Sequence, residues 1–329
     1  MKHISELINI ANDTLHHCSS IVVVPGLGRV IAAYLGPECE DAQKVFVMAL
    51  DKPGLLLKLS KKTGNPLLWH DKLNSKIYLL YSLFEDKDDK GNKPLSMVQR
   101  WMYCSTWLAE LDPITFTLKN EHKVDGGFGL LARCAPYTVA GRTYVPLYRE
   151  KDPRCELWEI RNGSLYRVSI FGDKLRPGFS NSKLGDGIAI QPTLIFHDNA
   201  LLAFCRNVNV DAKNAWVFKS HDFGLSWSDP SDTPLPNHNN SLVAIPWRDD
   251  YMVVLNNDRQ RGEIFLSNRY NTMRLGIPIV GTRSSYSYPN YCIDGDDLHI
   301  IHSNRGVLAV HRMDREFVDV TMVDQSKIK

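Results

Sequence analysis

The chain has 329 residues, of which 43% are hydrophobic and 23% are charged, and its formal net charge is +2. This is the composition of an ordinary globular domain, and so small a net charge excludes a nucleic-acid or anionic-membrane partner held mainly by electrostatics. No run of about 18 apolar residues occurs, which excludes a membrane-spanning helix.

The N-terminal segment has helical periodicity. Its apolar residues recur with the spacing of one helix face: Ile4, Leu7, Ile8 and Ala11. This spacing predicts one short amphipathic helix. The segment also lacks the apolar core of a secretory signal. We therefore expect a helical extension over residues 1–16, a single domain over residues 17–329, and a cytoplasmic location, which a component of a virus particle would also satisfy.

Short β-rich runs separated by turn residues dominate the rest of the chain. Examples are Ile21–Val24, Lys44–Met48, Lys76–Tyr81, Arg142–Tyr148, Leu201–Phe204, Ala215–Phe218, Tyr251–Leu255, Glu263–Leu266 and Leu298–Ile301. Many short strands of regular spacing predict an all-β sandwich, barrel or propeller.

A weak internal repeat favours the propeller. Six strands follow a small polar or proline-containing entry, at Ser19-Ser20, Asn65-Pro66, Arg133 to Pro136, Gln191-Pro192, Asn240-Ser241 and Tyr288-Pro289. The entries are 46, 68, 58, 49 and 48 residues apart. Propeller blades recur at about 40–50 residues, so this spacing predicts six blades.

One segment has the spacing of a specific turn. Ser220, Asp222, Gly224 and Trp227 form an S-x-D-x-G-x-x-W pattern. The aspartate can bond the backbone of its own turn, the glycine can adopt positive φ, and the tryptophan can fold over the hairpin. This pattern resembles the Asp-box of sialidases and other propellers, which is a folding device. A degenerate copy starts at Ser267.

Further motifs extend the resemblance to the BNR-repeat, sialidase-like superfamily of six-bladed propellers, in particular its BNR repeat-like branch. They are, in order, Gly36–Glu40, Gly64–Leu68, Leu131–Pro136 with Val145–Glu150, Ile190–Thr193 with Cys205–Asn207, Leu235–Asn237, Leu255–Asn257 and Ser287–Pro289. The resemblance implies three arginines on a substrate carboxylate, a tyrosine nucleophile activated by a glutamate, and an aspartate acid/base.

The entries of a propeller converge on one end of the channel, so their polar residues are the candidates. Arg133 and Arg206 are expected to orient the sugar, with Arg305 favoured as a third arginine over Arg259 and Arg261. The other candidate contacts are Asn65, Gln191 and Asn257. Glu40, Glu150 and Tyr288 are the candidate catalytic residues. Alternatively, the arginines pair internally with Glu40 or Glu150 and hold the blades together.

The pattern departs from that of sialidases. The first blade has no Arg-Ile-Pro motif, and Asp41 is the nearest match to the acid/base. A relative acting on another sugar through Glu40 and Glu150 remains an alternative. We therefore expect an exo-acting glycoside hydrolase or, alternatively, a non-catalytic propeller that binds glycan or serves as a scaffold. The expected partner is a carbohydrate, potentially an acidic one, within a homo-oligomer or a larger assembly.

The cysteines and histidines do not suggest a metal site. The seven cysteines are odd in number and form no C-x-x-C pair, which favours free, buried thiols. The eleven histidines show no ligand spacing relative to them. Asp294–Asp297 lacks the spaced ligands of a calcium loop and predicts a hairpin turn. We expect no metal and no cofactor.

Overall fold

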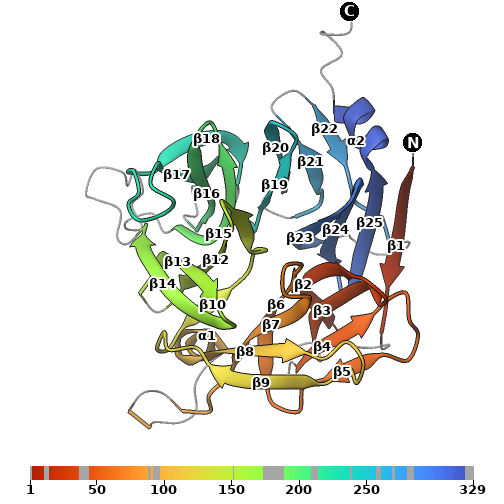
Figure 1. Cartoon of the computed structure of the whole chain (residues 1–329). Coiled ribbons are helices and arrows are strands. Elements are labelled where there is room, and N and C mark those ends of the chain that lie inside the picture. Colours follow the sequence, from red (N-terminus) through yellow and green to blue (C-terminus); the bar gives the residue numbers. More distant parts are fainter. Residues whose placement is uncertain are drawn as a thin grey trace, which may run out of the picture.

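The computed structural model describes residues 2–10, 15–36, 44–87, 90–91, 97–150, 152–172, 189–208, 214–237, 239–256, 261–268, 271–279 and 285–322. In these ranges the chain forms six antiparallel sheets arranged around a central channel, which confirms the all-β, six-bladed propeller (Figure 1). Neither of the two helices in these ranges has the length and hydrophobicity needed to cross a bilayer.

The blades follow one another along the chain. The first blade contains β2 (Leu15–Val24), β3 (Gly28–Gly36), β4 (Lys44–Ala49) and β5 (Leu56–Lys58). The second contains β6 (Thr63–Asp71), β7 (Lys76–Leu83), β8 (Ser105–Leu111) and β9 (Leu118–Lys123). The third contains β10 (Leu130–Ala132), β11 (Tyr137–Val139), β12 (Arg142–Arg149), β13 (Arg154–Arg161) and β14 (Ser164–Phe171).

The remaining blades have the same order. The fourth contains β15 (Ala189–His197), β16 (Ala200–Asn207), β17 (Asn214–Ser220) and β18 (Ser231–Pro236). The fifth contains β19 (Val243–Trp247), β20 (Asp250–Leu255), β21 (Phe265–Ser267) and β22 (Thr272–Arg274). The sixth contains β23 (Tyr286–Asp294), β24 (Asp297–Asn304), β25 (Val307–Asp314) and, as its outer strand, β1 (His3–Ile8).

The predicted N-terminal helix is wrong, because His3–Ile8 is the strand β1. It pairs antiparallel with β25 over the register His3↔Met313 to Ile8↔Leu308 (Figure 1). Pairing with β1 satisfies the hydrogen-bonding groups of the backbone along the edge of β25. The local spacing of apolar residues contains no information about this distant partner strand. The two ends of the chain thereby close the ring, and β1 is part of the propeller.

The core lies between the blades, because both faces of each sheet are covered. Alternate residues of β3 show this clearly. Val30, Ala32 and Tyr34 pack into the cluster shared with the second blade, whereas Ile31 and Ala33 pack into the cluster shared with the sixth. Such strands read as continuous apolar runs, since neither face of the sheet meets water.

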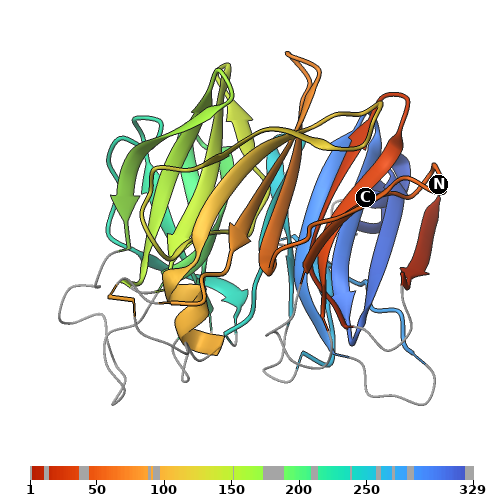
Figure 2. The ribbon, with the colours of Figure 1, turned by 90° about the horizontal axis from the view of Figure 1, so that it is seen from below.

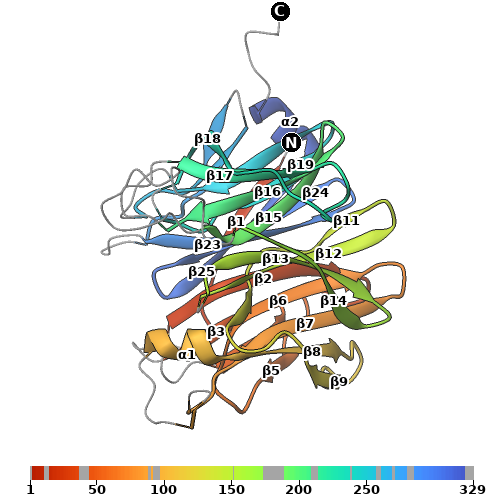
Figure 3. The ribbon, with the colours of Figure 1, turned by 90° about the vertical axis from the view of Figure 1, so that its left-hand side faces the viewer.

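Two helices lie at the edge of the ring. The helix α2 (Arg315–Met322) lies beside β22 and β25 at the rim (Figure 1). The helix α1 (Met97–Tyr103) lies beyond the ends of the strands, on one face of the ring (Figures 2 and 3). The helix follows β7 in the chain and precedes β8. Leu83, at the end of β7, pairs with Thr63, at the start of the inner strand β6. This face is therefore the one at which the inner strands begin, and we call its end of the channel the entry mouth.

The segment Ser220–Trp227 forms the turn between β17 and β18. Asp222 accepts hydrogen bonds from the Ser226 N–H at 2.9 Å and from the Ser220 hydroxyl at 2.7 Å. Gly224 has a φ of +86°. The Trp227 ring stacks on Phe171 of the third blade, with 4.3 Å between centroids. The Asp-box thus joins the fourth blade to the third.

The degenerate copy lies at the equivalent place in the fifth blade. Asn268, directly after β21, donates its backbone N–H to the carbonyl of Asn271 at 3.0 Å.

The six cysteines in the described ranges are free thiols, and five of them are buried. Cys39 lies outside those ranges.

Candidate functional site

The first strand of four blades carries the same distortion near the entry mouth. Cys18, Asn65, Gln191 and Tyr288 have φ values of 56°, 45°, 53° and 53°. At each of them the register of the inner strand shifts against its neighbour. Non-glycine residues in this region of φ are strained, and such strain concentrates at functional sites. The bulges re-aim these side chains at the place where the predicted entries lie.

Hydrogen bonds connect the bulge residues from blade to blade. Cys18 Sγ donates to Asn65 Oδ1 at 3.0 Å, and Asn65 Nδ2 donates to the Tyr148 hydroxyl at 3.3 Å. Gln191 Nε2 reaches the same hydroxyl at 3.4 Å. Arg206 Nη1 donates to Gln191 Oε1 at 3.2 Å. The structure therefore brings together three of the predicted contacts, Asn65, Gln191 and Arg206.

Arg133 is buried between blades. Only 1% of its surface is exposed. Its Nη1 donates to the Ser19 carbonyl at 3.2 Å and its Nη2 to the Pro289 carbonyl at 2.9 Å, while its Nε has no partner among the described atoms. Arg133 therefore joins the third blade to the first and the sixth. Its guanidinium also lies 5.1 Å from the centre of the Tyr288 ring.

Arg206 and Arg261 are held by consecutive asparagines. Arg206 Nε donates to Asn239 Oδ1 at 2.9 Å, and Arg261 Nε donates to Asn240 Oδ1 at 2.6 Å. The Arg261 guanidinium lies 5.8 Å from the centre of the Tyr288 ring. The contacts of Tyr288 thus favour Arg261 as the third arginine. Arg305 is exposed in the turn between β24 and β25.

The three arginines form a cationic cluster without an acidic partner in the described ranges. Every hydrogen bond that Arg133, Arg206 and Arg261 make there ends on a carbonyl or amide oxygen. Pairing with Glu150 is therefore not seen, and Glu40 lies outside the described residues. A buried guanidinium that lacks a carboxylate keeps its full attraction for an anion.

His17 was not among the predicted site residues, although it lies only two residues before the first entry at Ser19. Its ring meets the Tyr288 ring edge-on, with 4.4 Å between centroids. Burial, together with the positive charges of Arg261 and Arg133, lowers the pKa of His17 to about 3. His17 is therefore neutral at physiological pH and leaves the charge of the cluster to the arginines.

The predicted carboxylates are less well placed by the structure. Glu150 is half-buried directly after β12, and its charge contributes, after burial, to the raised pKa of Tyr148. It is thus near the row of bulge residues. Glu40 and Asn257 lie outside the described residues. No group of three His, Cys, Asp or Glu side chains in the described ranges is arranged to hold a metal ion.

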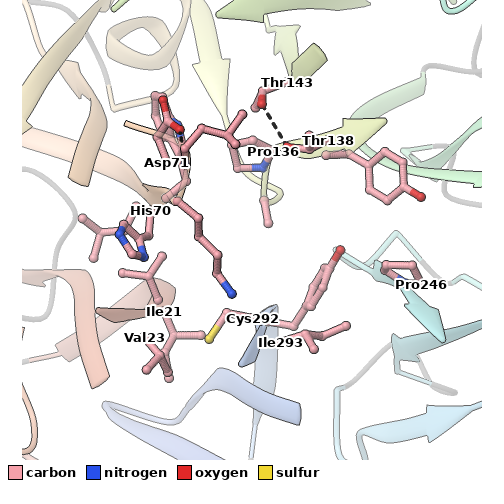
Figure 4. A pocket seen from close by; sticks show the side chains of 18 residues that line it. Ile21, Val23, His70, Asp71, Pro136, Thr138, Thr143, Pro246, Cys292 and Ile293 are labelled. Carbon is pink, nitrogen blue, oxygen red and sulfur yellow. Dashed lines mark hydrogen bonds between the residues drawn. The ribbon is translucent and has the colours of Figure 1, made fainter. Parts of the chain in front are cut away.

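A cavity of about 440 Å³ is lined mainly by residues from the later parts of the inner strands and from the turns and loops that follow them (Figure 4). Its wall is mainly apolar and includes Ile21, Pro136 and Ile293. Thr138 and Thr143 bond to each other there at 2.9 Å. Ser19, Arg133 and Pro289 each lie a few residues before cavity-lining residues in the chain, and none of the three lines the cavity itself.

Comparisons with known proteins agree with the propeller fold. No curated protein matches the chain. A protein of unknown function from Dyadobacter fermentans superposes with a TM-score of 0.70 at 11% identity, covering 94% of this chain and 98% of that one. The Hadza microbial sialidase Hz136 superposes with a TM-score of 0.69 at 11% identity, covering 92% and 66%.

A third similar structure is the Trypanosoma rangeli sialidase, with a TM-score of 0.60 at 12% identity, covering 96% of this chain and 60% of that one. The chain therefore spans about two thirds or less of the length of these two sialidases, and at such identities the likeness shows the fold. The model of the BNR repeat-like domain family matches residues 41–300. The chain belongs to the BNR repeat-like domain family, within the sialidase-like propellers.

Proposed function

We propose that this protein is a sialidase-like glycoside hydrolase that binds an acidic sugar at the entry mouth. The observation that carries the proposal is the set of three guanidinium groups around Tyr288 and Gln191, none of which has a carboxylate partner in the described ranges. Such a set costs free energy through like-charge repulsion and desolvation, and a ligand carboxylate would offset that cost.

The guanidinium nitrogens that are accessible indicate which arginines would contact the ligand. Arg206 and Arg261 are half-buried and use Nε for the asparagines. Among the described residues, the Nη2 of Arg206 and both Nη atoms of Arg261 have no partner and would be left for the ligand. Asn65 and Gln191 would meet the sugar hydroxyls. Arg133 has both Nη atoms on carbonyls and would support the Tyr288 ring through its guanidinium.

The proposed chemistry uses a tyrosine nucleophile, a known exception to the two-carboxylate pattern of glycosidases. The Tyr288 oxygen attacks the anomeric carbon as its proton passes to Glu150. The glycosidic oxygen leaves with a proton from Glu40, and water then hydrolyses the glycosyl–tyrosine bond. His17 and the guanidinium groups of Arg133 and Arg261 hold the tyrosine ring in place.

A second candidate is a propeller that binds an acidic glycan without cleaving it. The observation in its favour is the use of both terminal nitrogens of Arg133 by backbone carbonyls, since this arginine braces three blades. In this alternative the cluster keeps its anion preference, and Tyr288 is a contact.

The test is turnover of a panel of aryl glycosides that includes an aryl sialoside, together with calorimetric binding of free sialic acid. Arg206→Ala and Arg261→Ala are each expected to weaken binding about tenfold or more, because each removes a charge-assisted hydrogen bond of about 1.5–3 kcal/mol. Tyr288→Phe is expected to bind and not to turn over. Arg312→Ala, which removes an exposed arginine paired with Asp297, is the control.

Turnover in the native protein that is lost in Tyr288→Phe would establish the hydrolase, and the cleaved glycoside would name the sugar. Binding without turnover across the panel would establish the second candidate. Failure of the folded protein to bind any acidic sugar would refute both.

A further inference from the structure

Two consecutive asparagines before β19 hold the two accessible arginines of the cluster. Their Oδ1 atoms accept from the Nε atoms of Arg206 and Arg261 at 2.9 Å and 2.6 Å. Consecutive Cα atoms are about 3.8 Å apart, so one short piece of backbone positions the Nε atoms of both arginines. Arg206 and Arg261 come from different blades, and each is held by its own asparagine of this pair.

Asn237 connects Asn240 to the end of β16. Asn237 donates through Nδ2 to the Asn240 carbonyl at 2.7 Å and accepts from the backbone N–H of Asn207 at 3.3 Å. Asn207 is the neighbour of Arg206. Asn239 has a φ of 62°, a conformation that asparagine tolerates better than most residues. The loop and the end of β16 are thus tied together as one unit.

The chemical nature of the holding atom matters as much as its position. Two guanidinium groups directed at one ligand repel each other and would otherwise turn toward water. A carboxylate could hold them, but it would neutralise the charge and compete with an anionic ligand. An amide oxygen orients a guanidinium by a charge-assisted hydrogen bond and leaves its net charge intact.

We propose that Asn239 and Asn240 are positioning residues, which orient Arg206 and Arg261 toward the ligand while preserving their positive charge. This inference rests on the proposed function for the identity of the ligand. The positioning itself is independent of any ligand, because the hydrogen bonds are formed by the protein alone.

The proposal separates two kinds of substitution. Asn239→Ala and Asn240→Ala remove the orienting oxygen, so each is expected to weaken binding of sialic acid about tenfold. Asn240→Asp keeps an oxygen at the same place and forms an ion pair with Arg261. It is therefore expected to fold as stably as the native protein and yet to bind the sugar at least about a hundredfold more weakly. Asn74→Ala, in the exposed β6–β7 turn, is the matched control.

Two measurements on the full-length protein test this. The first is the hydrogen-exchange rate of the arginine Nε–H groups by NMR, without ligand. The rates of Arg206 and Arg261 are expected to be slow, and to rise at least tenfold in Asn239→Ala and Asn240→Ala respectively. The second is calorimetric binding of sialic acid, with urea unfolding to confirm that each variant is folded.

The outcomes are distinct. Unchanged exchange in the alanine variants, or native affinity in a folded Asn240→Asp variant, would overturn the positioning role. Faster exchange in the alanine variants, with weaker binding in all three, would support it. Slow native exchange that is lost in the variants, in a native protein that binds no acidic sugar, would support the positioning and refute the proposed function instead.

Discussion

Three histidines meet across the sixth blade, where the two ends of the chain close the ring. His302 Nδ1 faces the Ser303 carbonyl at 3.2 Å, and its Nε2 lies 3.0 Å from His311 Nε2. His311 Nδ1 lies 2.8 Å from the Ser5 hydroxyl and 3.2 Å from His3 Nε2. A carbonyl only accepts, so His302 carries its proton on Nδ1 and His311 donates to it; these tautomers follow from the hydrogen-bond network. The contact between the two Nε2 atoms holds one proton, so this network excludes the state in which His302 and His311 are both protonated.

Burial lowers the pKa of His302 to about 4. Burial and the neighbouring His302 and His3 hold the pKa of His311 well below its usual range. An unfolded histidine has a pKa of about 6.5, so below that pH the unfolded chain binds protons that the folded chain does not. Stability is therefore expected to fall as the pH falls from 6.5, until the folded-state pKa is reached.

The size of the effect follows from the proton count. Each such histidine costs about 1.4 kcal/mol per pH unit, or about 2 kcal/mol between pH 6.5 and pH 5. His302 and His17, whose pKa is lowered to about 3, together cost about 4 kcal/mol over this interval, and His311 acts in the same direction. The whole stability of an ordinary domain is about 5–15 kcal/mol. The propeller is thus expected to be much less stable at pH 5 than at pH 6.5.

The assay is urea unfolding followed by tryptophan fluorescence at pH 7, 6 and 5. His302→Gln keeps a donor and an acceptor and does not titrate, so its loss of stability between pH 6.5 and pH 5 is expected to be smaller than that of the native protein by about 2 kcal/mol. His122→Gln, at an exposed site on β9, is the matched control and is expected to follow the native protein. A native stability that is flat between pH 6.5 and pH 5, or equal slopes in native protein and His302→Gln, would refute the reasoning.

Three further predictions concern the contacts between and within blades, each measured as the free energy of unfolding in urea. Trp227→Ala removes a half-buried ring that stacks between two blades, and is expected to cost about 3 kcal/mol; a cost below about 1 kcal/mol would contradict the joining role of the Asp-box. Gly224→Ala is expected to cost about 1–3 kcal/mol, because φ is +86° and the new Cβ would lie 2.1 Å from the Leu157 side chain; native stability would disprove that conformation. Glu156→Gln leaves the buried Arg149 without its carboxylate and is expected to cost about 3–5 kcal/mol, and a neutral result would show that Arg149 finds another partner.

The blade pattern could be predicted from the sequence because it is a local signal. Entries such as Asn65-Pro66, Gln191-Pro192 and Tyr288-Pro289 all lie on the first strands of blades. The Asp-box turn also formed where its spacing predicts it. Strand periodicity and turn chemistry act over a few residues, so they survive in the sequence without knowledge of the partner strands.

The features that depend on the closing of the ring, namely the strand β1 and the contacts between blades, were decided by the tertiary structure. The residues His3–Ile8 have apolar spacing that suits a helix, yet pairing with β25, some 300 positions away, makes them a strand. The choice of Arg261 beside Tyr288, and the holding of Arg261 by Asn240, likewise depend on which side chains face each other at one mouth. The sequence alone determined the number of blades and the polar residues at the start of their inner strands. The contacts across the channel were decided only in the folded ring, because they join residues that no local pattern relates.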